Sequence, residues 1–136
     1  MRSVAFVLAL AMSAITAPVQ NSSLDNPTIL SDTQGYNFGP YINSLFNRVR
    51  QNWYAVMPEI AVKGQKGRAV VKFTIARDGK VKDLQLVLSA GDQALDNAAQ
   101  AAIKVSSPLP PLPEGFKGDQ IVLQLSFLYN LKGADR

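Results

Sequence analysis

The fold of this chain is decided by residues 68–89, whose sequence is RAVVKFTIARDGKVKDLQLVLS. Both ends of this stretch are rich in β-branched and large apolar residues, and the pair Asp78 and Gly79 stands between them. An Asp-Gly pair between two such runs is typical of a hairpin with a type I′ turn. We therefore predict two antiparallel strands, over residues 68–76 and 81–89.

The side chains provide a check on the register that this turn would set. One predicted face carries apolar pairs and the other carries polar pairs, as expected for an antiparallel sheet that is covered on one face. The apolar pairs are Phe73 with Leu84, Val71 with Leu86 and Ala69 with Leu88, and the polar pairs are Lys72 with Gln85 and Thr74 with Asp83. Ile75 opposite Lys82 breaks this pattern, and a β-bulge that turns Val81 inward would restore it.

Two helices flank the hairpin in the sequence. Gly39 and Pro40 begin the first helix, because proline fits the first helical position, and Pro58 ends it near Met57 by disfavouring helical geometry at the preceding residue. Its apolar residues recur at helical spacing, at Ile42, Leu45, Phe46, Val49 and Trp53. Asp92 caps the second helix, whose apolar stripe is predicted at Leu95, Ala98, Ala99, Ala102 and Ile103.

Together these elements predict an α+β domain with the element order α-β-β-α-β, in which two helices pack on one face of a three-stranded antiparallel sheet. The last strand is residues 121–129, which follow a proline-rich connector over residues 106–114. A helix between the second and third strands brings the third strand beside the first, so the predicted strand order is 2-1-3. The last strand is then an edge strand with unpaired main-chain donors and acceptors.

The two ends of the chain differ in character from this domain. Arg2 is followed by a stretch of apolar and small residues without charge, so residues 1–17 are predicted to be a signal peptide or a short signal anchor that exports the protein. Residues 18–38 lack periodicity and are rich in Asn, Ser, Asp, Gly and Pro, which predicts a flexible linker. The domain is assigned to residues 39–131, and residues 132–136 to a disordered tail.

The composition limits the chemistry that this chain can perform. It contains no cysteine and no histidine, which removes thiolate nucleophiles, imidazole bases and the usual nitrogen and sulfur ligands of zinc. We therefore expect a protein that is not an enzyme and that uses no metal and no cofactor. The net charge of +4 is mild for 136 residues, so nucleic acid is not an expected partner.

Three features have both a chemical and a structural interpretation. Trp53 could stack on a ligand, but it continues the apolar stripe of the first helix, which favours a place in the core. Asp92 and Asp96 lie one helical turn apart and could act as acid and base, but helix capping and a solvated face are the favoured interpretations. The prolines of residues 108–113 have the spacing of proline-rich ligands, although a structural connector is favoured.

Seven short motifs occur in a fixed order along the predicted domain. They are QNWY at 51–54 with Pro58, GRAVVKF at 67–73, DGKV at 78–81, SAGD at 89–92, ALDNAA at 94–99, SPLPPLP at 107–113 and FLYN at 127–130. In this order they resemble the C-terminal domain of the TonB/TolA family, nearer its TolA-like branch. The resemblance extends over roughly residues 41–130.

The resemblance implies a function in protein binding. In this family an N-terminal inner-membrane anchor and a long periplasmic linker carry a small domain that contacts outer-membrane transporters or other envelope proteins and couples them to a proton-driven motor. Family members receive a partner strand at a sheet edge. The matching positions here are Ile121, Val122, Leu123, Gln124, Leu125, Ser126, Phe127, Leu128 and Tyr129. We therefore expect a periplasmic domain that acts in energy-coupled transport or in envelope integrity.

The N-terminal part departs from the family pattern. The linker predicted over residues 18–38 is much shorter than the family's spacer, which is rich in proline and charge. A second interpretation therefore stays open, in which the chain is a self-associating secreted structural module, without energy transduction, that forms a homodimer through the same edge. In both interpretations the only expected contact with the membrane is through residues 1–17, in the case that they are retained as an anchor and not cleaved as a signal peptide.

Overall fold

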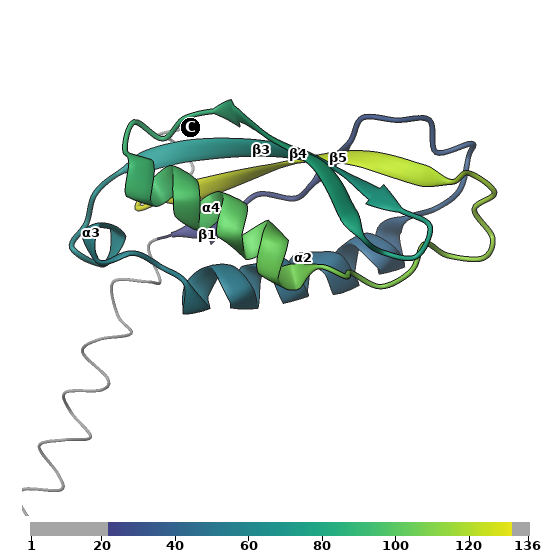
Figure 1. Ribbon diagram of the computed structural model, residues 1–136, viewed down its shortest axis with the longest axis horizontal. Helices are drawn as coiled ribbons and strands as arrows, with labels where there is room; N and C mark the ends of the chain where they lie inside the picture. The colour runs from purple at the N-terminus through teal and green to yellow at the C-terminus, as the bar shows by residue number, and fades with distance from the viewer. Residues whose placement is uncertain (1–21, 132–136) are drawn as a thin grey trace, which may run out of the picture.

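The last strand of the sheet pairs with the first strand of the hairpin, as the sequence predicts. The computed structural model describes residues 22–131. Its elements, in chain order, are β1 (Ser23–Leu24), β2 (Thr28–Ile29), α2 (Gly39–Ala55), α3 (Glu59–Val62), β3 (Gly67–Ala76), β4 (Val81–Leu88), α4 (Gln93–Ser106) and β5 (Gln120–Tyr129). The predicted α+β class and the neighbouring order β4-β3-β5 are confirmed, and helices α2 and α4 lie together on one face of the sheet (Figure 1).

Three of the predicted segments lie wholly or partly outside the described residues. These are the signal peptide or anchor at residues 1–17, the beginning of the linker at residues 18–21, and the tail at residues 132–136. The predictions for these segments therefore remain predictions.

The turn of the hairpin differs from the prediction by one residue. The Ala76 amide donates to the Lys80 carbonyl at 2.9 Å, and the Gly79 amide donates to the Ala76 carbonyl at 2.8 Å, so the loop contains residues 77–79. Within this loop only Gly79 has a positive φ, of 94°, whereas a type I′ turn needs two such residues. A Cβ at Gly79 would lie 1.9 Å from the Leu109 carbonyl oxygen, so the connector before β5 packs directly against this glycine.

The predicted bulge forms in β4 and restores the apolar face of the hairpin. Ile75 lies opposite Val81, and the register then shifts by one residue. Asp83 lies within this shift and has a φ of 54°, as the irregular backbone of a bulge allows. A second shift places Leu88 opposite Val70, so the predicted pairing of Leu88 with Ala69 is wrong. Two other predicted pairs are confirmed, Val71 with Leu86 and Lys72 with Gln85, whereas Thr74 lies opposite Lys82, so its predicted pairing with Asp83 is wrong because the bulge shifts the register.

Both helices turn the predicted apolar stripes towards the sheet. The buried residues of α2 recur every fourth position, at Tyr41, Leu45, Val49 and Trp53. The Asp92 side chain caps α4 by accepting hydrogen bonds from the amides of Ala94 and Leu95. Small residues on the buried face of α4 let this helix lie close to β3 and to α2, and they are Ala98, Ala99 and Ala102.

A chain of hydrogen bonds in the core joins both helices to β5. The Trp53 indole N–H donates to the Tyr129 hydroxyl at 3.0 Å, and this hydroxyl donates to the Leu95 carbonyl at 2.7 Å. All three residues are 0% exposed, so the predicted core position of Trp53 is confirmed. Burial raises the pKa of Tyr129 above its ordinary value, so the hydroxyl keeps the proton that it donates.

The segment before α2 is the largest departure from the prediction. Residues 22–38, predicted to belong to a flexible linker, contain β1 and β2, and both strands pair antiparallel with the outer side of β5. Leu24 and Phe38 in this segment are buried. The physical reason is that the edge of β5 offers main-chain hydrogen bonds and adjacent apolar surface, and the segment uses both. The edge predicted to be open is therefore covered in this structure.

Replacing Tyr129 with phenylalanine should destabilise the domain by about 1–3 kcal/mol, because the Trp53 N–H and the Leu95 carbonyl would both lose their buried partner. Urea unfolding followed by circular dichroism measures this change. The control is Tyr54→Phe, which removes a hydroxyl from a residue that is 37% exposed and should cost less. Equal losses of stability in the two variants would contradict the proposed importance of the buried hydroxyl.

Candidate strand-binding edge

The nine residues predicted to bind a partner alternate between the two faces of the sheet. The odd-numbered side chains lie under the helices and are 0% exposed, namely Ile121, Leu123, Leu125, Phe127 and Tyr129. On the opposite face Val122, Gln124 and Ser126 are half-buried, and Leu128 is buried. The nine side chains therefore do not form one surface, and the strand is accessible to a partner mainly through its main chain.

The main-chain groups of β5 also alternate, and half of them point away from β3. The Val122 carbonyl accepts from the Leu30 amide at 2.8 Å, and the Ser126 carbonyl accepts from the Asp25 amide at 3.0 Å. Because the N–H and C=O groups of one residue point to the same side of an antiparallel strand, the even-numbered residues face outward. The groups that strand addition would use thus belong to residues 122, 124, 126 and 128.

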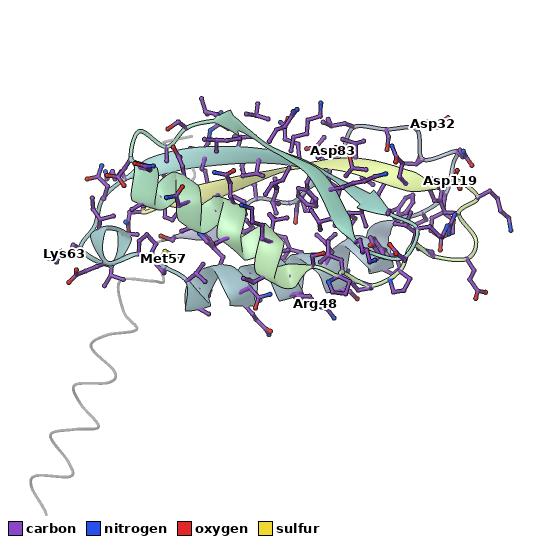
Figure 2. The ribbon with its side chains drawn as sticks, in the orientation of Figure 1. Asp32, Arg48, Met57, Lys63, Asp83 and Asp119 are labelled. Atoms are coloured by element: carbon purple, nitrogen blue, oxygen red, sulfur yellow. The ribbon has the colours of Figure 1, made fainter. Side chains whose placement is uncertain are left out.

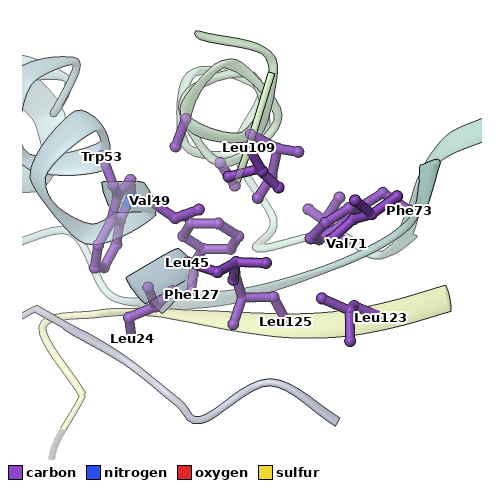
Figure 3. Close-up of a cluster of buried hydrophobic side chains, with 14 of the residues drawn as sticks. Leu24, Leu45, Val49, Trp53, Val71, Phe73, Leu109, Leu123, Leu125 and Phe127 are labelled. Atoms are coloured by element: carbon purple, nitrogen blue, oxygen red, sulfur yellow. The ribbon is translucent and has the colours of Figure 1, made fainter. Parts of the chain in front are cut away.

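Residues 22–31, which we call the N-terminal cap, occupy this outward side of β5. The paired residues are Ser23 with Leu128, Leu24 with Phe127, Thr28 with Gln124 and Ile29 with Leu123. Leu24 is 7% exposed and lies beside Phe127 at the margin of the core (Figure 3), and Ile29 is partly buried against the same core. The cap therefore adds two aliphatic side chains to the core face of the sheet.

Serine side chains hold both ends of the N-terminal cap. The Val122 amide donates to the Ser31 hydroxyl oxygen at 2.9 Å, and the Asn130 amide donates to the Ser22 hydroxyl oxygen at 3.2 Å. The Tyr54 hydroxyl of α2 donates to the Ser22 carbonyl, also at 3.2 Å. Side-chain oxygens thus take the place of main-chain partners where the strand pairing ends.

The middle of the N-terminal cap interrupts the strand pairing. The registers of β1 and β2 on β5 differ by one residue, so Asn26 and Pro27 both lie across from Leu125. Pro27 has no N–H to donate. The cap consequently forms two separate strands of two residues each rather than one continuous strand.

A shallow hollow lies beside the N-terminal cap on the face of the sheet opposite the helices. It has a volume of about 430 Å³ and is lined by Leu30, Lys72, Thr74, Asp83, Gln85 and Val122. Leu30 of the cap forms part of its wall and is 48% exposed, and Figure 2 labels Asp83 on β4 in this region. The cap therefore borders both faces of β5.

The two aspartates considered as an acid and base pair have structural roles instead. Asp92 is the N-cap of α4, as predicted. Asp96 is 8% exposed, so the predicted solvated face is wrong at this residue. Its carboxylate accepts hydrogen bonds from the Ser89 hydroxyl and, at 2.7 Å, from the Ala90 amide, and thereby fixes the connection between β4 and α4.

The proline-rich connector is fastened to α2. The Tyr41 hydroxyl donates to the Pro110 carbonyl at 2.7 Å, and the Arg48 guanidinium donates to the Pro108 carbonyl at 2.7 Å. Burial raises the pKa of Tyr41 to about 12, with Arg48 offsetting part of the rise. These contacts support the interpretation of residues 108–113 as a structural connector.

The part of the chain that the structure describes offers few sites for other chemistry. Between residues 22 and 131 there is no group of three or more His, Cys, Asp or Glu side chains placed to hold a metal ion. In the same range no helix combines the length and the apolar character needed to cross a membrane. The candidate site rests on the outward main-chain groups of β5.

Comparison with known proteins matches the greater part of the domain. A family model described as TonB C terminal matches residues 38–127. The TonB protein of Helicobacter pylori is 34% identical over 107 residues, which cover 75% of this chain and 35% of that protein. The TonB protein of Haemophilus influenzae is 35% identical over 63 residues, which cover 46% of this chain and 23% of that protein. The chain thus spans about a third of the length of the Helicobacter relative.

Solved structures agree with the sequence comparison. A solution structure of the C-terminal domain of Helicobacter pylori TonB has a TM-score of 0.50 and 32% identity, and the alignment covers 75% of this chain and 94% of that one. A shorter fragment of the same domain has a TM-score of 0.50 and 28% identity, with 70% of this chain and 95% of that one covered.

The fold places the chain among the small α+β domains in which two helices cover one face of an antiparallel sheet, and this sheet has five strands instead of the predicted three, because β1 and β2 add to the edge of β5. Within that class it belongs to the TonB C-terminal domain family, since the family model covers nearly the whole of the predicted domain. The predicted resemblance to the TonB/TolA family is confirmed. The assignment to the TolA-like branch stays a prediction, because the matched relatives are TonB proteins.

We expect the amides of β5 to alternate in hydrogen exchange. Odd-numbered amides bond to β3 and should exchange only on global unfolding, whereas even-numbered amides should exchange at least tenfold faster through opening of the N-terminal cap. Nuclear magnetic resonance measures both sets within one strand. Uniform protection along β5 would contradict independent opening of the cap.

Proposed function

We propose that this domain is a periplasmic protein-interaction domain that binds an outer-membrane or other envelope protein by accepting an extended strand at β5. Strand addition supplies affinity through main-chain hydrogen bonds and specificity through side chains at alternate positions. The bound protein would thereby be connected to energy-coupled transport or to envelope integrity. Binding, rather than catalysis, is the proposed activity.

The observation that carries this proposal is the outward row of main-chain groups on β5. β3 holds β5 in an unbroken register, from Gly67 opposite Tyr129 to Ala76 opposite Gln120. The even-numbered groups therefore stay in a fixed line whether or not the outer side is occupied. That another segment of the same chain already pairs there supports the ability of this edge to accept a strand.

Export to the periplasm is part of the same proposal. Residues 1–17 would direct the protein across the inner membrane, either as a cleaved signal peptide or as a retained anchor. Membership in the TonB C-terminal domain family supports this location. Mass spectrometry of the mature N-terminus distinguishes the two cases, because an intact Met1 means a tethered protein.

Site-specific photo-cross-linking in cells tests the binding site. A photoreactive residue in place of Gln124, which is half-buried beside the outward edge, should form an adduct with an envelope protein. The same residue in place of Arg50, which is exposed on α2, is the matched control and should give no such adduct. Adducts from the α2 position alone would place the partner on the helical face and refute binding at β5.

Self-association without energy transduction is the alternative function. Dimerisation through β5 would require a second copy to replace the N-terminal cap, because the cap already uses the outward groups of that strand. Sedimentation velocity at micromolar concentration tests this alternative. A monomer would count against it, whereas a dimer disrupted by Gln124→Pro, which removes an outward N–H, would support it.

A further inference from the structure

We propose that the N-terminal cap, residues 22–31, is a built-in occupant of the β5 edge and that a partner strand binds by displacing it. This displacement presupposes the proposed function, strand addition at β5. It adds the competing segment within the chain and the chemistry of the peptide that can replace it.

The cap and a partner strand would need the same atoms. The Val122 carbonyl already accepts from Leu30, its amide donates to Ser31, and the Ser126 carbonyl accepts from Asp25. A partner strand cannot pair with this side of β5 while these groups are engaged. Neighbouring strands of a sheet lie about 4.8 Å apart, and the cap already occupies that position beside β5. Binding of the two segments is therefore mutually exclusive.

The cap is built to leave more easily than an unbroken strand would. Its pairing consists of two strands of two residues each, separated by Asn26 and Pro27. Its ends depend on the serine hydroxyls of Ser22 and Ser31 instead of main-chain groups. Leu24 is its main buried aliphatic side chain, whereas Leu30 is 48% exposed. The cap thus holds the edge with fewer ladder bonds than β5 can accept.

The positions that the cap fills define the chemistry of the peptide that can replace it. Leu24 and Ile29 lie opposite Phe127 and Leu123 on the core side of the edge. An extended peptide without proline in its centre would instead bond to all the outward residues of β5 and place a side chain opposite Leu125 as well. The fitting partner is therefore an extended segment with aliphatic residues at every second position.

A synthetic peptide serves as the probe, so that the test needs no identified partner. It carries the sequence of residues 22–31 without Pro27 and with Asn26→Val, which makes the register continuous and adds an aliphatic side chain opposite Leu125. With a fluorescein label, its binding to the full chain is measured by anisotropy. Leu24→Asp should loosen the cap and increase the affinity for the peptide at least tenfold.

The matched control for this variant is Val87→Asp. Val87 is 52% exposed on β4, far from the cap in the strand order, so the same change of side chain there should leave the affinity unchanged. Circular dichroism establishes that both variants are folded.

A reversible disulfide provides a second and independent test. Thr28 and Gln124 lie opposite each other, and the Cα atoms of a hydrogen-bonded antiparallel pair are about 5.5 Å apart, within the range that a disulfide spans. The chain has no cysteine of its own, so Thr28→Cys with Gln124→Cys can form only one disulfide within the chain, and oxidation at low protein concentration with non-reducing electrophoresis separates it from bonds between chains. Oxidation should lock the cap and weaken peptide binding at least tenfold, and reduction should restore it.

Equal binding of the peptide to the oxidised and reduced forms would overturn the displacement proposal, and so would equal affinities of the unmodified chain and Leu24→Asp. The photo-cross-linking experiment separates this failure from failure of the proposed function, with the photoreactive residue moved to Ser126, which is half-buried on the same face, because Gln124 carries a cysteine of the lock. Equal cross-linking of an envelope protein to the locked and reduced forms would support the proposed function and refute competition by the cap. If oxidation weakens peptide binding but no envelope protein is cross-linked, displacement of the cap is supported and the proposed envelope partner is refuted.

Discussion

The antiparallel pairing of β5 with β3 is the constraint on which the rest of this structure depends. Ten residues on each strand pair without a shift, in contrast to β3 and β4, whose register shifts twice. This pairing fixes which side chains of β5 enter the core and which main-chain groups face outward. It also places the Tyr129 hydroxyl where Trp53 of α2 and the Leu95 carbonyl of α4 both reach it. One ladder therefore orients both helices and the candidate binding edge.

The same pairing sets the outward row of main-chain groups on β5 that the proposed function would use. Edge strands expose a row of main-chain groups, and proteins usually cover such rows or use them. Here the N-terminal cap covers the row incompletely, with a break at Pro27. A strand that β3 holds in register on one side, and that a short interrupted segment pairs with on the other, is the arrangement that the proposed displacement requires. The β3–β5 pairing lies within residues 38–127, which the TonB C-terminal family model matches, except for its last two residues, whereas the N-terminal cap lies outside that match.

Much of the fold could be predicted because its signals are local. Three of these signals depend only on residues that are close in the sequence. They are the hydrophobic periodicity, the helix cap at Asp92 and the proline, Pro58, that ends the first helix. The mismatch at Ile75 even indicated the bulge that the structure has near Asp83. The turn was predicted one residue too short, because the Asp-Gly pair fits both a type I′ turn and a three-residue loop that ends in a glycine of positive φ. The contact of Gly79 with the Leu109 carbonyl, thirty residues later, accompanies the observed loop.

The sequence by itself determined the two long helices, the three long strands with their order β4-β3-β5, and the strand that carries the candidate site, since each follows from periodicity, turn chemistry and short connections. Only the tertiary structure decided what lies on the outer side of that strand. The cap has no periodicity and contains a proline, so nothing local marks it as a strand. Its partners lie 91 residues away, between Ser31 and Val122, and 108 residues away, between Ser22 and Asn130. Such short strands exist only because a preformed edge and an adjacent core provide the hydrogen bonds and the apolar surface that the segment lacks alone.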